Sequence, residues 1–187
     1  ETAVLSDGNP QTNIRFGYAV ATDGDRILVG ATHNDSAGNN AGAAFVFTLK
    51  GGKWQQETVL FPTGRPPLNG SAFGWSVAIE GNTVVVGSPG NKGKMDIEES
   101  GAVYPYHFDG VTWRQEALLS ANNALDFDYL GTSIAIDARG IFVGAPDHDQ
   151  NQVDVGAVYY FAISSARQSL TTMQAIMEIY LPIYQFK

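Results

Sequence analysis

A motif that occurs three times decides how this chain folds. Its copies read Phe16-Gly17 … Gly30-Ala31-Thr32, Phe73-Gly74 … Gly87-Ser88-Pro89 and Leu130-Gly131 … Gly144-Ala145-Pro146. The interval between copies is the same both times, and a third landmark follows each copy: Gly42-Ala43-Ala44-Phe45, Gly101-Ala102-Val103-Tyr104 and Gly156-Ala157-Val158-Tyr159. A fixed period is typical of a repeat architecture, in which each repeat buries its faces only against its neighbours.

Each repeat begins with a predicted hairpin of two short strands. In the first repeat these strands are 16–21 and 27–30, and the Asp23-Gly24 pair between them is a strong signal for a tight turn. The second strand of each hairpin is a continuous apolar run, which predicts that both of its faces are covered. A polar loop then leads to the Gly-Ala-Val-Tyr-like strand. A second turn leads to a strand that carries Trp54 or Trp113 and alternates as an outer strand should.

Four short antiparallel strands per repeat, stacked face to face, predict an all-β fold of β-propeller blades. We expect the repeats to cover residues 1–163, with blades that begin near residues 16, 73 and 130. Residues 1–6 resemble the end of the Trp-bearing strand and are expected to be the outer strand of a neighbouring or closing blade. Because a propeller ring needs about four blades or more, three cannot close one. We therefore expect a homo-oligomer, or a part of a longer chain, that completes the ring.

The tail, residues 164–187, departs from the repeat pattern. Its apolar residues fall at helical spacing and predict a short helix: Met173, Ile176, Met177, Tyr180 and Leu181. A strand over residues 179–186 is the alternative. The stretch is too short to span a membrane, and Glu178 and Pro182 interrupt it. Core packing or self-association is the expected role.

Composition excludes several classes of function. A hydrophobic content of 44% and a charged content of 16% over 187 residues indicate a packed globular domain. The net charge of −8, with no basic cluster among 11 Lys and Arg, argues against nucleic-acid binding and against insertion into anionic membranes. The absence of cysteine excludes disulfides and thiolate metal sites. Asn34-Asp35-Ser36 and Asn69-Gly70-Ser71 match the acceptor pattern for N-glycosylation.

The three in-phase copies resemble the FG-GAP repeat, which builds the seven-bladed propeller of integrin α-chains and occurs in many secreted or surface proteins of microbes. The resemblance covers about residues 13–163 and implies a propeller used for extracellular binding and adhesion. Integrin repeats hold calcium in an Asp-x-Asn-x-Asp-Gly-x-x-Asp loop between the Phe-Gly and Gly-Ala-Pro strands. Tight hairpins replace that loop here and offer too few oxygens for an ion that takes six to eight. Calcium is therefore not expected at the family's usual place.

The richest cluster of oxygen ligands lies in another loop. Its acids and amides alternate along the chain and can aim several oxygens at one hard cation: Asp147, Asp149, Asn151 and Asp154. Because the chain offers no soft ligands there, Ca²⁺ is the expected metal. A solvated polar loop without metal is the alternative, and the lack of a turn-forming glycine favours it.

Two groups of residues are the candidates for ligand binding. Tyr18 and Trp75 follow the Phe-Gly pairs and are expected near the central channel, where flat aromatic faces can stack on a sugar, although packing between blades is the alternative. The loops after the triplets, 33–41, 90–100 and 147–155, are long, polar and different in each repeat. They contribute His33, Asp35, Asp96 and His148.

Together these features favour a non-catalytic binding and adhesion module, extracellular or on the cell surface, that recognises a protein or a glycan through its rim loops. A lectin with one pocket per repeat is the first alternative. The propeller part of a secreted hydrolase is the second, and a purely structural role in assembly is the third. No Gly-x-Ser-x-Gly elbow supports a Ser-His-Asp triad, so no enzyme activity is expected.

Overall fold

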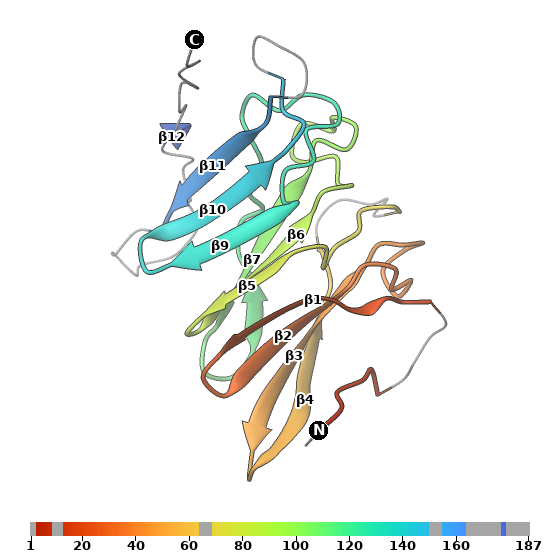
Figure 1. Ribbon diagram of the computed structural model, residues 1–187, viewed down its shortest axis with the longest axis vertical. Helices are drawn as coiled ribbons and strands as arrows, with labels where there is room; N and C mark the ends of the chain where they lie inside the picture. Colours follow the sequence, from red (N-terminus) through yellow and green to blue (C-terminus); the bar gives the residue numbers. More distant parts are fainter. Residues whose placement is uncertain (1–2, 9–12, 64–68, 150–154, 164–176, 179–187) are drawn as a thin grey trace, which may run out of the picture.

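Three antiparallel sheets follow one another along the chain (Figure 1). The computed structural model describes residues 3–8, 13–63, 69–149, 155–163 and 177–178, and no helix occurs among them. Each sheet has four strands and corresponds to one repeat. We call the sheets blades 1, 2 and 3. The expected all-β fold of four-stranded antiparallel blades is confirmed, and the blades stand in series with blade 2 in the middle (Figure 1).

The strands of each blade pair with their neighbours in chain order. Blade 1 contains β1 (Phe16–Asp23), β2 (Arg26–Ala31), β3 (Ala43–Lys50) and β4 (Lys53–Leu60). Blade 2 contains β5 (Val77–Glu80), β6 (Thr83–Ser88), β7 (Ala102–Phe108) and β8 (Trp113–Gln115). Blade 3 contains β9 (Ser133–Asp137), β10 (Gly140–Ala145), β11 (Ala157–Ala162) and β12 (Met177–Glu178).

The hairpins form where the sequence predicts them. Asp23 pairs with Arg26 at the end of β1 and β2, which leaves a two-residue turn. Gly24 occupies its first position with a φ of 54°. Two-residue hairpin turns require such positive φ values, which glycine adopts without steric cost.

Each blade buries its two faces against different neighbours, because alternate side chains of a strand point to opposite sides. We call the face toward the preceding blade the front and the face toward the following blade the back. Leu28 and Val46, on the back of blade 1, pack with Val84 and Val86 on the front of blade 2. The next interface repeats this arrangement with Val85, Val103, Ile141 and Val143. The innermost strands also touch in sequence, β1 with β5 and β5 with β9.

The first glycine of each triplet allows the next blade to approach closely. A Cβ atom at Gly30 would lie 2.0 Å from the carbonyl oxygen of Gly74, and one at Gly87 would lie 2.1 Å from that of Gly131. No side chain fits into such a gap. Packing between blades therefore requires glycine at these positions.

Backbone hydrogen bonds hold the same contacts in register. The Phe73 amide donates to the Ala41 carbonyl over 2.9 Å, and the Leu130 amide donates to the Ser100 carbonyl over 3.1 Å. These bonds join the Phe/Leu-Gly segment of one blade to the loop before the third strand of the preceding blade. The repeated landmarks of the sequence are thus the parts that join neighbouring blades.

The two ends of the chain differ from the expectation. At residues 177–178 the tail is a strand rather than a helix, because β12 pairs with β11 as the fourth strand of blade 3. The rest of the expected helix, and the alternative strand over 179–186, lie outside the described residues. Residues 3–8 contain no strand. Leu5 instead packs on the front of blade 1.

Candidate ligand-binding site

A pocket of about 400 Å³ lies between blades 2 and 3. It is formed where the Phe/Leu-Gly segments and the ends of the triplets meet. Blade 2 contributes Trp75, Pro89 and Glu99, and blade 3 contributes Tyr129, Thr132 and Asp147. The pocket is therefore made by two repeats together.

The pocket exists because one repeat position changes from a large to a small side chain. The residue after the Phe/Leu-Gly pair is Tyr18 in blade 1, Trp75 in blade 2 and Thr132 in blade 3. The rings of Tyr18 and Trp75 are in contact, with centroids 4.9 Å apart and planes tilted by 47°. Thr132 has no ring to make the equivalent contact with Trp75, and its hydroxyl donates to the Tyr129 carbonyl over 2.8 Å. The space beside Trp75 thus remains open.

The polar groups of the pocket are acidic. The Tyr129 hydroxyl hydrogen-bonds the Glu99 carboxylate, and this bond raises the pKa of Tyr129, with smaller contributions from burial and from the charges of Glu99 and Asp147. The residues that line the pocket include no Lys or Arg. Two carboxylates beside aromatic faces favour a neutral or cationic ligand and repel an anion.

A buried hydrogen-bonded pair supports the two pocket residues of blade 3. Asp128 precedes Tyr129, and His148 follows Asp147. The His148 Nδ1 lies 2.9 Å from the Asp128 Oδ2, and the two side chains are only 3% and 2% exposed. The Leu125 amide donates to the same carboxylate oxygen over 2.7 Å. The pair therefore holds together the two segments that carry the pocket residues.

The second ring nitrogen of His148 is also engaged. Its Nε2 lies 3.3 Å from the side-chain nitrogen of Asn123. The Tyr159 hydroxyl donates to the side-chain oxygen Oδ1 of Asn123 over 3.0 Å. An amide nitrogen can only donate, so this arrangement fits the tautomer with the proton on Nδ1. The ring is thus fixed from both sides.

His148 occupies a position that is structural in every blade. Its backbone makes the same hydrogen bonds as Asn34 and Asn91, which are buried at the equivalent places in blades 1 and 2. In blade 2, the Asn91 side chain donates to the Tyr104 hydroxyl over 3.0 Å. The position organises the loop after each triplet, and among the described residues only blade 3 does so with a histidine hydrogen-bonded to a carboxylate.

The other residues singled out in the rim loops do not line this pocket. His33 is partly buried, and burial, together with the charge of Arg15, lowers its pKa despite the nearby Asp35. The Asp35 Oδ1 accepts a hydrogen bond from the Asn40 amide over 2.7 Å within its own loop. Asp96 is exposed, with a φ of 64°.

Calcium binding by the loop after the third triplet stays a prediction. Asp147 faces the pocket and Asp149 is exposed, whereas Asn151 and Asp154 lie outside the described residues. In the part of the chain that the structure describes, no three His, Cys, Asp or Glu side chains come close enough together to hold a metal ion.

Sequence reasoning identified Trp75 and Asp147 but did not bring them together, and it missed Glu99 and Asp128. The position of Glu99 within its repeat indicates where it lies. Glu99 lies two residues before Gly101, and the Tyr129 amide donates to its carbonyl over 3.1 Å as one of the bonds between blades. Aligning the repeats in space would therefore have placed Glu99 beside Tyr129.

Comparison with known families gives one result that covers most of the chain. A family model described as FG-GAP repeat matches residues 1–47, 54–106 and 113–161. No curated protein matches the chain. FG-GAP repeats are associated with integrin-like adhesion and binding propeller modules, are typically non-catalytic and occur in extracellular domains. The described residues contain no helix that is long and apolar enough to cross a membrane.

Proposed function

We propose that this chain, which belongs to the FG-GAP repeat family, is a non-catalytic extracellular binding and adhesion module. Its ligand enters the pocket between blades 2 and 3. The ligand class is a neutral glycan, free or carried by a protein. The observation that carries the proposal is the pocket of about 400 Å³ that combines Trp75 and Tyr129 with the carboxylates of Glu99 and Asp147.

The chemistry of the pocket suits a sugar ring. One face of a sugar is apolar and packs on a flat aromatic side chain, as Trp75 and Tyr129 offer. Its hydroxyls can donate hydrogen bonds to Glu99 and Asp147, because ionised carboxylates only accept. The volume lies within the range of about 300–1,000 Å³ that small-molecule sites occupy.

Charge narrows the class of glycan. Glu99 and Asp147 would repel sialic acids, uronic acids and phosphorylated sugars, and the net charge of −8 extends that repulsion to long range. Neutral hexoses and N-acetylhexosamines carry no such penalty. A ligand protein would reach this site through its attached glycan.

The proposal favours a single site over a lectin with one pocket per repeat. Between blades 1 and 2, the Tyr18 ring stacks on Trp75, where the third blade offers only Thr132. Ala72 and Gly90 of blade 2 stand there at the positions of Tyr129 and Asp147, and Asn40 of blade 1 stands at the position of Glu99. The equivalent place therefore lacks both carboxylates and the Tyr129 ring.

A hydrolase is the weaker alternative. The titratable pair of this region, Asp128 and His148, is 2–3% exposed, and both ring nitrogens have partners. A general base has to come within hydrogen-bond reach of its substrate. The pair is better suited to positioning Tyr129 and Asp147.

The experiment is calorimetric titration with a panel of neutral and sialylated oligosaccharides, in calcium and in chelator. We expect binding of at least one neutral glycan and none of the sialylated ones. Trp75→Ala should weaken binding about tenfold or more, equivalent to about 1.4 kcal/mol. Thr132→Trp should block the pocket while leaving the Glu99 and Asp147 carboxylates in place. A requirement for calcium would support the metal loop at Asp147–Asp154.

A matched pair of acid variants checks the site. Glu99→Gln removes a pocket charge, and Asp96→Asn removes an exposed charge from the same loop. Only the first should change glycan affinity. Binding that is insensitive to Trp75→Ala and Thr132→Trp would overturn the proposed site. A protein ligand that binds equally after its glycans are removed would overturn the proposed ligand class.

A further inference from the structure

The back of blade 3 has the features with which blades 1 and 2 receive the next blade. Gly144 is the triplet glycine, equivalent to Gly30 and Gly87. A Cβ atom at either of those two would collide with a carbonyl of the following blade, whereas one at Gly144 would meet only Ser133 of its own blade. A position shaped for a close neighbour therefore has none in the described part of the chain.

Side chains on the same face show the difference directly. Val103, on the back of blade 2, is 0% exposed, and Val158, at the equivalent place in blade 3, is 57% exposed. Ala78 is buried in blade 2, whereas Ala135 is exposed in blade 3. In the part of the chain that the structure describes, the back of blade 3 is thus an apolar sheet face without the neighbouring blade that covers its counterparts.

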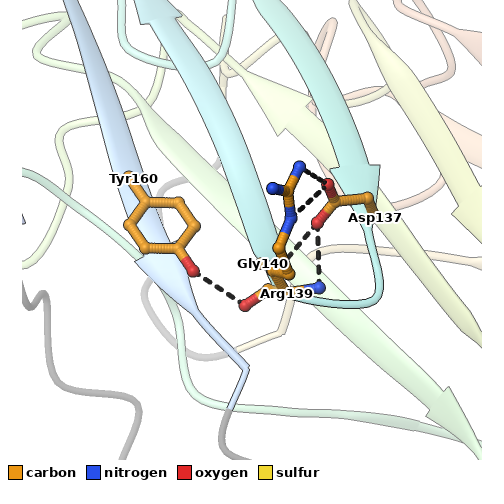
Figure 2. A network of polar contacts seen from close by, with 4 residues as sticks. All are labelled: Asp137, Arg139, Gly140 and Tyr160. Atoms are coloured by element: carbon orange, nitrogen blue, oxygen red, sulfur yellow. Dashed lines mark hydrogen bonds and ion pairs between the residues drawn. The ribbon is translucent and has the colours of Figure 1, made fainter.

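At the turn between β9 and β10, the polar groups of this face form hydrogen bonds with one another. Figure 2 shows Asp137 bonded to the guanidinium and amide of Arg139, and the Tyr160 hydroxyl donating to the Arg139 carbonyl over 2.9 Å. In blade 1 the equivalent acid, Asp23, instead accepts the Gly81 amide of the following blade over 2.5 Å. A partner on the back of blade 3 must therefore gain its binding energy from the apolar middle of the face.

The front of blade 1 is the matching surface. Gly74 and Gly131 lie against the preceding blade, where a Cβ atom would come within 2.5 Å of the Ala43 carbonyl oxygen and 2.8 Å of the Ala102 carbonyl oxygen. Gly17, at the equivalent place in blade 1, has open space around it. On the same strand, Val20 is 63% exposed.

Among the described residues, only the outer part of that front is covered. Leu60, at the end of β4, and Leu119, in the segment after β8, pack on the fronts of blades 2 and 3. Leu5 packs on the front of blade 1 in the same way. The described residues of the leading segment, 3–8, thus cover the outer part of the front and not β1.

We propose that blade 1 of a second copy docks its front on the back of blade 3, head to tail. The Gly17 carbonyl of that copy faces Gly144, its Phe16 amide donates to the Val155 carbonyl, and its Val20 packs beside Val158. The commitment to a second copy rests on the chain itself, which carries both halves of an interface that it already forms twice. Blade 2 separates these halves within one chain (Figure 1), so the contact has to form between chains.

A head-to-tail contact closes a ring when its rotation allows. Two copies would supply six blades, above the minimum of about four for a propeller. Such a ring would present the pocket between blades 2 and 3 once per copy. Multivalent presentation of a weak glycan site would raise the avidity for a surface that carries many glycans.

The experiment is sedimentation equilibrium of the 187-residue chain over a range of concentrations at physiological salt or above, since copies of net charge −8 repel each other at low salt. We expect a mass that rises above 20.0 kDa with concentration. Val158→Asp and Val20→Asp each block one half of the contact and should weaken association about tenfold or more. Val111→Asp, at a hairpin position that is 88% exposed, is the matched control and should leave the mass unchanged.

Mixing the two blocked variants gives the decisive result. The Val20→Asp chain keeps an intact back, and the Val158→Asp chain keeps an intact front. Head-to-tail docking therefore predicts that, at a concentration where each variant alone is mostly monomeric, the mixture forms a dimer. A wild-type chain that is monomeric at every concentration would overturn the proposal. So would association that survives both substitutions, or a mixture that fails to pair while circular dichroism shows both variants folded.

Discussion

Blade 2 and blade 3 carry the same residue pattern on their back faces, but only blade 2 has a neighbour there. Gly87 and Val103 of blade 2 are in contact with blade 3 and fully buried, whereas Gly144 and Val158 of blade 3 are in partial contact with solvent. The strands, turns and register are nevertheless the same. The comparison teaches that a repeat forms its sheet by local strand pairing. How much its back face contributes to the free energy of unfolding depends on whether a following blade covers that face.

The largest predicted effect is a difference in stability between substitutions at Gly87 and at Gly144, the triplet glycines of blades 2 and 3. Gly87→Ala would place a Cβ atom 2.1 Å from the Gly131 carbonyl oxygen, and backbone cannot move aside without separating the blades. We expect a loss of more than about 3 kcal/mol in the free energy of unfolding. Gly144→Ala meets only a rotatable serine side chain and should change it by about 1 kcal/mol or less.

Urea unfolding at low protein concentration measures both glycine variants without assembly. Equal losses for the two variants would mean that the contact between blades 2 and 3 is not the close one described here.

An intermediate effect concerns the residue after the triplet. His148→Ala would leave the Asp128 carboxylate buried without its hydrogen-bond donor on Nδ1, which we expect to cost about 3 kcal/mol of unfolding free energy. Asn91→Ala, at the equivalent place in blade 2, removes a neutral bond to Tyr104 and should cost about 1 kcal/mol. Thermal unfolding compares the two.

A further variant separates a structural from a positioning role for His148. His148→Asn restores the residue of the other blades and should recover part of the stability. Glycan affinity should stay reduced, because the segments that carry Tyr129 and Asp147 lose the hydrogen bond from His148 to Asp128. Full recovery of affinity together with stability would contradict the positioning role.

The smallest effect compares two exposed turn carboxylates. In blade 2, Asp109 accepts hydrogen bonds from the Thr112 and Val111 amides and from Arg114, and these lower its pKa to about 2, with the Thr112 amide contributing most. In blade 3, the side-chain bond from Arg139 is the main cause of the lowered pKa of Asp137. Because the folded pKa is below the unfolded one in both cases, each group adds stability above its ordinary pKa near 4.

That contribution disappears as the pH falls through the folded pKa, near 2 for Asp109. Carbon NMR titration of the carboxyl groups measures this directly. Arg139→Ala should bring the pKa of Asp137 most of the way back to its ordinary value. Arg114→Ala should leave the pKa of Asp109 well below its ordinary value, because the backbone donors remain. Equal recovery in the two variants would contradict the assigned causes.

Much of the fold could be predicted because the signals are local. The Asp23-Gly24 turn, the apolar runs of β2, β6 and β10 and the recurring glycines depend on residues a few positions apart. The ends were harder to predict. Met177 and Glu178 belong to a helical pattern in sequence but pair with β11 in the structure, because an unpaired strand edge offers hydrogen bonds that outweigh the weak preference of a short helix.

The candidate site was only partly predictable. Trp75 and Asp147 could be selected by residue type, but their meeting depends on how blade 3 stacks on blade 2. The change from Tyr18 and Trp75 to Thr132 is visible in the aligned repeats, yet it opens a pocket only because the blades hold these positions side by side. His148 belongs to a polar loop by sequence and is buried by the fold.

By itself, the sequence determined that this chain is a series of three four-stranded repeats of the FG-GAP type, since alternation, turn residues and a constant period act within each repeat. The tertiary structure alone decided which faces are covered, where the acidic aromatic pocket lies, and that Asp128 and His148 form a buried pair. The physical reason is distance. These features join residues of different repeats or distant loops, and only the packing of whole blades sets the separation between them.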